Sequence, residues 1–193
     1  MLDSSDVLGG EQLVRFSPSG EKLRLLLHCC CAPCASHVLE QLVPLYRVTV
    51  LFYNPNIEPR EEYDRRAAEF SKLPMLDENT GSVDLLWSYY DTERFTAAVA
   101  GFEDQTEGGE RCRACFKLRL ARTAELARDM GFDVFATTLS VSPHKDAVAL
   151  NEIGCTLAGE YGVEFLSADF KKRDGYKRSI ELSKQYGLYR QNY

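Results

Sequence analysis

Four cysteines within six positions form the most distinctive chemical feature of this sequence: Cys29, Cys30, Cys31 and Cys34. They follow an apolar run at 23–28, which is typical of a buried strand, and precede a stretch at 35–45 whose apolar spacing predicts a helix. We therefore expect the cysteines in a strand-to-helix turn. In an open α/β sheet, ligands bind at such turns, and the free N–H groups of the helix favour thiolates or an anionic metal cluster.

Two further cysteines, Cys112 and Cys115, have the spacing that places two thiols on one face of a helix. Alone, such a pair fits a dithiol, half of a zinc site or two buried small residues. Together with Cys30, Cys31 and Cys34 the pair offers five thiolates, which exceeds the needs of one tetrahedral ion. An iron–sulfur cluster bound by four of them leaves a fifth for a second metal or for the substrate. The spacing does not decide which four bind the cluster.

Three residues close to these motifs are expected to be structural. His28 ends the first predicted strand, and we interpret it as a satisfied polar group beneath the site rather than as a metal ligand. Cys29 points away from its neighbours by strand alternation, and Cys155 lies in an ordinary amphipathic helix. Both cysteines are therefore predicted to pack in the interior.

Polar residues close a second predicted strand, at 46–53. Tyr53, Asn54 and Asn56 stand at its end, which should be the same edge of the sheet as the cysteines. We regard the asparagines as candidate substrate-binding residues, although turn formation alone explains them equally well.

A third strand, predicted at 132–139, ends in a hydroxyl-rich loop. Ser140 and Ser142 precede Lys145, and this combination suits the binding of a phosphate or a polar ring. Capping of the next helix by Ser142 is an equally good explanation for that residue.

The overall composition favours one intracellular domain. The chain has 193 residues, 45% of them hydrophobic, which suits one substantial core better than two domains. We expect a loose tail at 1–20 and a single metal-binding catalytic domain at 21–193. No segment approaches the ~20 apolar residues that span a bilayer, so no membrane partner and a cytoplasmic location are expected. In that reducing compartment, clustered cysteines favour metal or redox chemistry over disulfides.

Predicted strands and helices alternate along the chain. The strands are expected at 23–28, 46–53, 82–90, 132–139 and 163–168. The main helices are expected at 35–45, 58–73, 113–130, 145–162 and 176–187. About five repeats of strand and helix predict an α/β fold whose parallel sheet is covered by helices on both faces.

The net charge of −6 argues against bulk attraction to nucleic acid, but basic residues gather in two places. One run is Arg111, Arg113, Lys117, Arg119, Arg122 and Arg128, and the other is Lys171, Lys172, Arg173, Lys177 and Arg178. Such runs are commonly solvated faces. Because both flank elements of the expected site, we select Arg113, Lys117, Lys172 and Lys177 as candidate contacts to a polyanionic substrate.

Six sequence blocks, taken together, resemble the cobalamin-independent epoxyqueuosine reductase family. They are His28–Cys34, Tyr53–Ile57 with Glu62-Tyr63, Arg111–Cys115 with Arg119-Leu120, Thr137–Pro143, Phe170–Gly175 and Tyr189–Gln191. The resemblance covers most of the chain from His28 onward. It implies a Rossmann-like fold related to adenine-nucleotide α-hydrolases, the HUP class, and adds Arg190 to the candidate substrate-binding residues.

The resemblance also implies a chemistry. The substrate would be a tRNA with epoxyqueuosine at the wobble position of its anticodon, and the reaction its two-electron deoxygenation to queuosine, the last step of queuosine biosynthesis. A [4Fe-4S] cluster with an adjacent iron or zinc ion would deliver electrons from an external electron donor that the sequence does not identify. Opening of the epoxide also needs a proton or a Lewis acid on oxygen. Tyr53 and Asp174 are the candidate proton donors.

The sequence departs from the family pattern in two places and leaves two rival functions. Cys29 occupies a position expected to vary, and the chain stops at Tyr193 where family members commonly continue with a cysteine-containing tail.

One rival is an ATP-dependent tRNA-modifying enzyme of the same fold class. That enzyme would need a glycine-rich phosphate loop where this chain has cysteines. The other rival is a protein with structural zinc.

Overall fold

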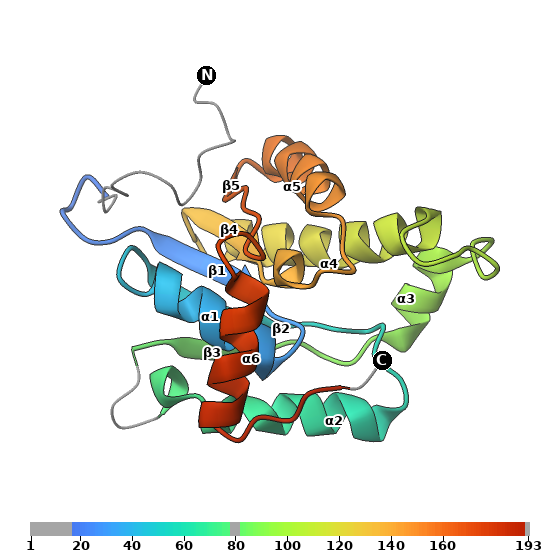
Figure 1. The fold of residues 1–193 in the computed structure, drawn as a ribbon. Coiled ribbons are helices and arrows are strands. Elements are labelled where there is room, and N and C mark those ends of the chain that lie inside the picture. The colour runs from blue at the N-terminus through green and yellow to red at the C-terminus, as the bar shows by residue number, and fades with distance from the viewer. Residues whose placement is uncertain (1–16, 78–81, 192–193) are drawn as a thin grey trace.

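The structure is a computed structural model that describes residues 17–77 and 82–191. Its centre is a parallel sheet in the order β3-β2-β1-β4-β5 (Figure 1). The strands are β1 (Arg24–His28), β2 (Arg47–Phe52), β3 (Asp84–Trp87), β4 (Val134–Thr137) and β5 (Glu164–Phe165). The predicted α/β fold with a parallel sheet is confirmed. Of the tail predicted at 1–20, residues 1–16 lie outside the described residues.

Helices cover both faces of the sheet, as the alternation predicted (Figure 1). The α-helices are α1 (Ala32–Leu42), α2 (Arg60–Ala68), α3 (Thr92–Val99), α4 (Glu110–Asp129), α5 (Ala147–Tyr161) and α6 (Gly175–Gln185). The described residues also form the 3-10 turns η2 (Glu69–Lys72), η3 (Pro74–Leu76) and η4 (Leu139–Val141). Within the described part of the chain, no helix has both the length and the apolar composition needed to cross a bilayer.

The central strand β1 is buried on both faces. Leu25 and Leu27 face the core that α1 covers, whereas Leu26 faces the core beneath α4 and α5. This division follows from the alternation of side chains along a strand. Burial on both sides explains why β1 has a continuous apolar sequence instead of an alternating one.

The order of the strands creates a switch point beside β1. The chain runs outward from β1 through β2 to β3, and then returns to form β4 on the other side of β1. Leu25 pairs with Val134 and His28 with Thr137, so β1 and β4 end at the same level. In doubly wound sheets, ligands bind at the carboxyl ends of the strands where the order reverses. The cysteine turn after β1 lies at this position.

Two helices begin earlier than the sequence predicted. α1 starts at Ala32 because Pro33 is compatible with a first helical turn, and α4 starts at Glu110. Cys34 and Cys112 are therefore each the third residue of a helix. At that position each side chain lies in the first turn, whose N–H groups have no partner within the helix.

The predicted loop at 140–144 begins as the 3-10 turn η4, and the helix that follows is not capped by Ser142. The carboxylate of Asp146 caps α5 by accepting hydrogen bonds from Val148 N at 2.8 Å and Ala149 N at 3.2 Å. Ser142 Oγ instead accepts from His144 N at 3.3 Å. The capping explanation for Ser142 is therefore wrong.

Candidate metal centre

Three cysteines converge where β1 ends and α1 begins. The sulfur atoms of Cys30, Cys31 and Cys34 all lie within 4.8 Å of one another, and those of Cys30 and Cys31 are 3.7 Å apart. Cys31 has an extended backbone as the N-cap of α1, and the helix brings Cys34 back toward it. All three residues are half-buried. Such a group of sulfur atoms could hold a metal ion or one side of a metal cluster.

The three thiols are electrostatically unequal. Hydrogen bonds from Cys31 and Cys34 hold the pKa of the Cys30 thiol well below its usual range, and the positive charges of Lys145 and Arg119 lower it further. The same hydrogen bond to Cys30 raises the pKa of Cys31 to about 12. The hydrogen bonds of Cys34 with Cys30 and Cys31 raise the pKa of Cys34. The group therefore concentrates its negative charge on Cys30, and binding of a metal would release the protons of the other two thiols.

His28 supports the turn from beneath, as predicted. Its side chain is fully buried, with Nε2 3.0 Å from the carbonyl oxygen of Tyr53 and Nδ1 3.0 Å from Thr137 Oγ1. A carbonyl only accepts, so we assign the proton to Nε2, and Nδ1 accepts from the threonine. Burial lowers the pKa of His28 to about 4, so the ring is neutral at neutral pH. This neutral ring ties β1 to the ends of β2 and β4.

A pocket of about 480 Å³ adjoins the cysteine group. Its walls come from the turn after β1, the segment after β2, the region from η4 to α5, helix α6 and the last described residues of the chain. Four cationic side chains line it, and among the described lining residues none is an aspartate or glutamate. The cations are Arg66, Arg119, Lys145 and Arg190. This pocket therefore attracts anions although the chain as a whole is acidic.

The structure brings seven of the predicted site residues to this pocket: Cys30, Cys31, Cys34, Asn56, Ser142, Lys145 and Arg190. Other predicted residues lie close by but serve the framework. Asn54 is 1% exposed and donates from Nδ2 to the carbonyl of Cys29 at 2.9 Å. Ser140 Oγ accepts from Phe170 N at 3.3 Å. These two side chains position the loops that form the pocket.

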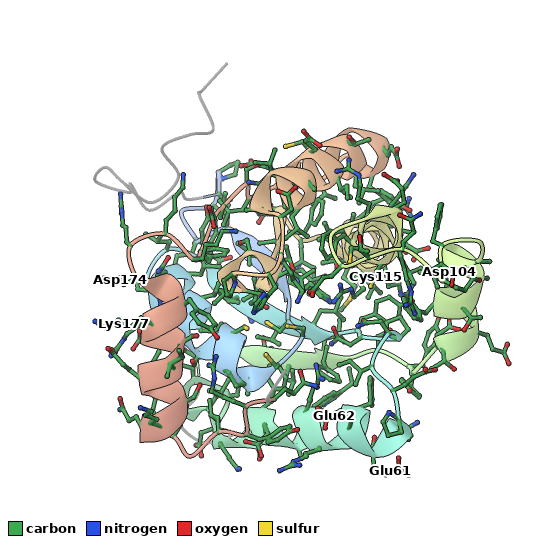
Figure 2. All side chains as sticks on the ribbon, turned by 45° about the vertical axis from the view of Figure 1, so that its right-hand side comes forward. Glu61, Glu62, Asp104, Cys115, Asp174 and Lys177 are labelled. Atoms are coloured by element: carbon green, nitrogen blue, oxygen red, sulfur yellow. The ribbon has the colours of Figure 1, made fainter. Side chains whose placement is uncertain are left out.

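The two predicted proton donors do not line the pocket. The hydroxyl of Tyr53 is buried in the core beneath α4 and has no hydrogen-bond partner among the described residues. Burial raises its pKa. Asp174 is exposed beside the first turn of α6, as Figure 2 shows.

The predicted basic contacts also lie outside the pocket walls. Lys117, Lys172 and Lys177 are exposed, and Figure 2 shows Lys177 on the side of α6 that faces away from Cys115. Arg113 forms an ion pair with Glu152, with 3.4 Å between Nη2 and Oε2. The cations that reach the pocket are other residues, which come from α2, α4, the loop before α5 and the C-terminal segment.

Cys112 and Cys115 are half-buried on α4 and do not belong to the group of sulfur atoms within 4.8 Å. The sulfur of Cys112 accepts a hydrogen bond from Gly108 N at 3.3 Å, so it lies against the preceding loop. Cys30 and Cys112 nevertheless pack against the same apolar core. These two cysteines therefore lie on the same side of the sheet, whereas Cys34 packs against the core on the other side.

The two cysteines predicted to pack in the interior differ. Cys29 is 0% exposed, which confirms the prediction for that residue. Cys155 is exposed on α5, with its sulfur 3.3 Å from Ser167 Oγ, so its predicted packing role is wrong. The amphipathic pattern around Cys155 was correct for the helix but did not place this position on the buried side.

Sequence analysis missed a clasp that holds the C-terminal wall of the pocket. Glu62 on α2 accepts from Arg66 Nε at 2.8 Å, from the hydroxyl of Tyr189 at 3.2 Å and from Gln191 Nε2 at 2.7 Å. The ion pair with Arg66 is largely buried. Glu62 and Tyr189 both occur in family-like blocks, but nothing in the sequence shows that residues so far apart pair.

The clasp leads to a prediction. Glu62→Ala is expected to destabilise the protein by about 1–3 kcal/mol, because it removes the common acceptor of three hydrogen bonds. It should also expose residues 188–191 to amide exchange. Figure 2 shows the matched control: Glu61 lies on the opposite side of α2 and is exposed, so Glu61→Ala should change neither property. Chemical denaturation and hydrogen exchange test both variants, and equal stability of the two would contradict the clasp.

Comparison with known proteins agrees with this geometry. The family model described as epoxyqueuosine reductase QueH matches residues 25–193. The protein of that name from Streptococcus pyogenes serotype M1 is 42% identical over 171 residues, which are 88% of this chain and 67% of that protein. The one from Staphylococcus epidermidis is 40% identical over 183 residues, 93% of this chain and 77% of that protein. The one from Thermotoga maritima is 37% identical over 172 residues, which are 88% of this chain and 86% of that protein. The chain belongs to the epoxyqueuosine reductase QueH family, a family of oxidoreductases.

Proposed function

We propose that this chain reduces epoxyqueuosine to queuosine in the anticodon of a tRNA. The observation that carries the proposal is the group of three thiols on the wall of a cationic pocket that has no carboxylate among its described lining residues. Thiols supply ligands for a redox centre, and the cations suit an RNA substrate. Membership of the QueH family supplies the identity of the modified base.

The residues present fit an iron–sulfur cluster. The sulfur atoms of Cys30, Cys31 and Cys34 already lie within 4.8 Å of one another, and Cys112 and Cys115 offer further thiols from α4, where Cys112 packs against the same apolar core as Cys30. We propose that four of these five cysteines hold a [4Fe-4S] cluster, and that the fifth holds an iron or zinc ion. When bound, the cluster would supply the electrons, which reach it from an external donor, and the ion would act as a Lewis acid.

The other pocket residues would bind and orient the substrate. Lys145 and Arg190 carry charges that match RNA phosphates, and Asn56 and Ser142 add hydrogen-bonding groups to the lining of the same pocket. Tyr53 and Asp174, the proton donors predicted from the sequence, have no support from their positions outside the pocket. Among the described lining residues of the pocket, Lys145 carries a transferable proton.

The test is metal analysis and turnover on anaerobically purified protein. We expect at least four iron atoms with acid-labile sulfide per chain. Reduction with dithionite should then convert epoxyqueuosine in tRNA to queuosine, detected by mass spectrometry of the nucleosides. One zinc without sulfide and without conversion would favour the structural zinc protein. Conversion of a tRNA base that requires ATP would favour the adenylating enzyme.

A second prediction concerns which cations contact the RNA. Each phosphate contact to single-stranded RNA adds roughly 0.7 to the slope of log K against log salt. Lys145 lines the pocket, whereas Lys177 is exposed outside it. We expect Lys145→Ala to reduce the slope by about 0.7 and to weaken tRNA binding. Lys177→Ala removes the same charge from the exposed basic run. A reduced slope in this variant would show that the run also contacts the tRNA, and an unchanged slope would show that it does not. A parental slope in the Lys145 variant would exclude this contact.

A further inference from the structure

Arg119 on α4 is a buried cation between the two cysteine motifs. Its side chain lines the pocket, yet the residue is only 3% exposed. Nε donates to the carbonyl oxygen of Cys115 at 3.2 Å, and the guanidinium lies 5.9 Å from the ring centroid of Phe116. These contacts fix the position of the charge but leave it without neutralisation, because both partners are uncharged.

The lack of a carboxylate partner distinguishes Arg119 from two other arginines with little exposure, Arg66 and Arg122. Arg66 is paired with Glu62 at 2.8 Å, and Arg122, one turn further along α4, is paired with Glu125 at 2.7 Å. Within residues 17–77 and 82–191, no ion pair involves Arg119. A buried ion without a counter-charge costs several kcal/mol, so a folded protein normally provides an anion for it.

The anionic groups available in the pocket are thiolates. Cys30, Cys31 and Cys34 line the same walls as Arg119, and no aspartate or glutamate is found among the described lining residues. An assembly of several thiolates and a metal cluster commonly has a net negative charge, and one-electron reduction makes it more negative. A fixed cation in a poorly solvated wall stabilises the reduced form more than the oxidised form.

We propose that Arg119 is a positioning residue that provides the counter-charge of the cysteine centre and thereby raises its reduction potential. The proposal rests on the proposed function only in that the cysteines hold a redox-active centre. It assigns no contact between Arg119 and the substrate. Its guanidinium acts through the centre, from a position fixed by the carbonyl of Cys115.

The experiment compares Arg119→Gln, Arg119→Lys and the control Arg122→Gln. Arg122 lies on the same helix, is also little exposed and does not line the pocket. Each protein is purified anaerobically as the full chain, and iron, acid-labile sulfide and the midpoint potential are measured without substrate. We expect a lower midpoint potential in Arg119→Gln, a potential closer to the parent in Arg119→Lys, and no change in Arg122→Gln. A parental potential in Arg119→Gln would overturn the proposal.

Loss of the iron centre in Arg119→Gln would also be informative, because Arg119→Lys then tests whether the charge is needed. Recovery of iron in Arg119→Lys would show that the positive charge is required. Equal loss of iron in both variants would show that only the shape of the side chain matters and would overturn the proposal. The potential is measured without tRNA. If the potential of Arg119→Gln is shifted but the parent protein does not convert epoxyqueuosine, only the proposed function is refuted. If the parent protein converts epoxyqueuosine but the potential of Arg119→Gln is unshifted, only the role of Arg119 is refuted.

Discussion

Cys34→Ala is expected to lose its iron and its reductase activity together. Turnover should fall by at least about 1,000-fold, which is the order of magnitude for loss of an essential catalytic group. Cys34 supplies one of the three sulfur atoms that lie within 4.8 Å of one another. Its replacement leaves only two sulfur atoms in this group, which are too few to hold one side of a stable centre. Iron and sulfide analysis alongside nucleoside mass spectrometry measures both losses.

Cys155→Ala is the matched control, because this cysteine is exposed on α5 and belongs to neither motif. It should retain full iron content and activity. Equal iron in the two variants would remove the cysteine turn from the proposed centre. Cys112→Ala, tested in the same way, is expected to resemble Cys34→Ala. Iron retained there but lost in Cys115→Ala would assign the fourth ligand to Cys115.

Gly175→Ala is expected to lower the free energy of unfolding by about 3 kcal/mol or more, which is the upper range for overpacking. A Cβ at Gly175 would collide with the carbonyl oxygen of Phe170 and lie 2.6 Å from His37 Nε2. The colliding atom is backbone, so α6 itself must move. For a chain of this size, such a loss corresponds to a melting temperature lower by roughly 6–12 °C.

Gly159→Ala provides the comparison within the same protein. Gly159 lies in α5, and nothing is within 4 Å of the position that a Cβ would take. Alanine there should stabilise the helix by up to about 1 kcal/mol. Differential scanning calorimetry distinguishes the two. Because Tyr176 and Ile180 of α6 line the pocket, Gly175→Ala should also weaken tRNA binding. A Gly175 variant as stable as the Gly159 variant would show that α6 is not packed as described.

Local patterns in the sequence were sufficient to predict the sheet and the three-cysteine part of the proposed metal centre. The apolar run in β1 and the turn at Cys30, Cys31 and Cys34 involve residues close in sequence, so strand alternation and helix geometry determine how they meet. The carboxyl ends of parallel strands share one edge, which placed Asn56 correctly on the pocket wall.

Long-range packing determined what the sequence did not predict. Arg119 belongs to a basic run whose members look alike, and only the packing of α4 buries this one while Lys117 stays exposed. The clasp of Glu62 with Tyr189 likewise joins residues that are 127 positions apart in the sequence. Charge and spacing alone therefore selected exposed lysines as RNA contacts, whereas the cations of the pocket come from α2, α4, the loop before α5 and the C-terminal segment.

The clasp on residues 189–191 has a consequence for how the protein is made. The turn with Cys30 is synthesised early, whereas the wall formed by residues 189–191 is synthesised after the other walls of the pocket. At about 5–20 residues per second, the thiols wait on the order of 10 s for the last wall to be completed. Pairing of distant parallel strands adds further delay. During that interval the cysteines of a nascent chain are open both to metal delivery and to oxidation, so exclusion of oxygen during expression should protect the centre more than its exclusion after folding.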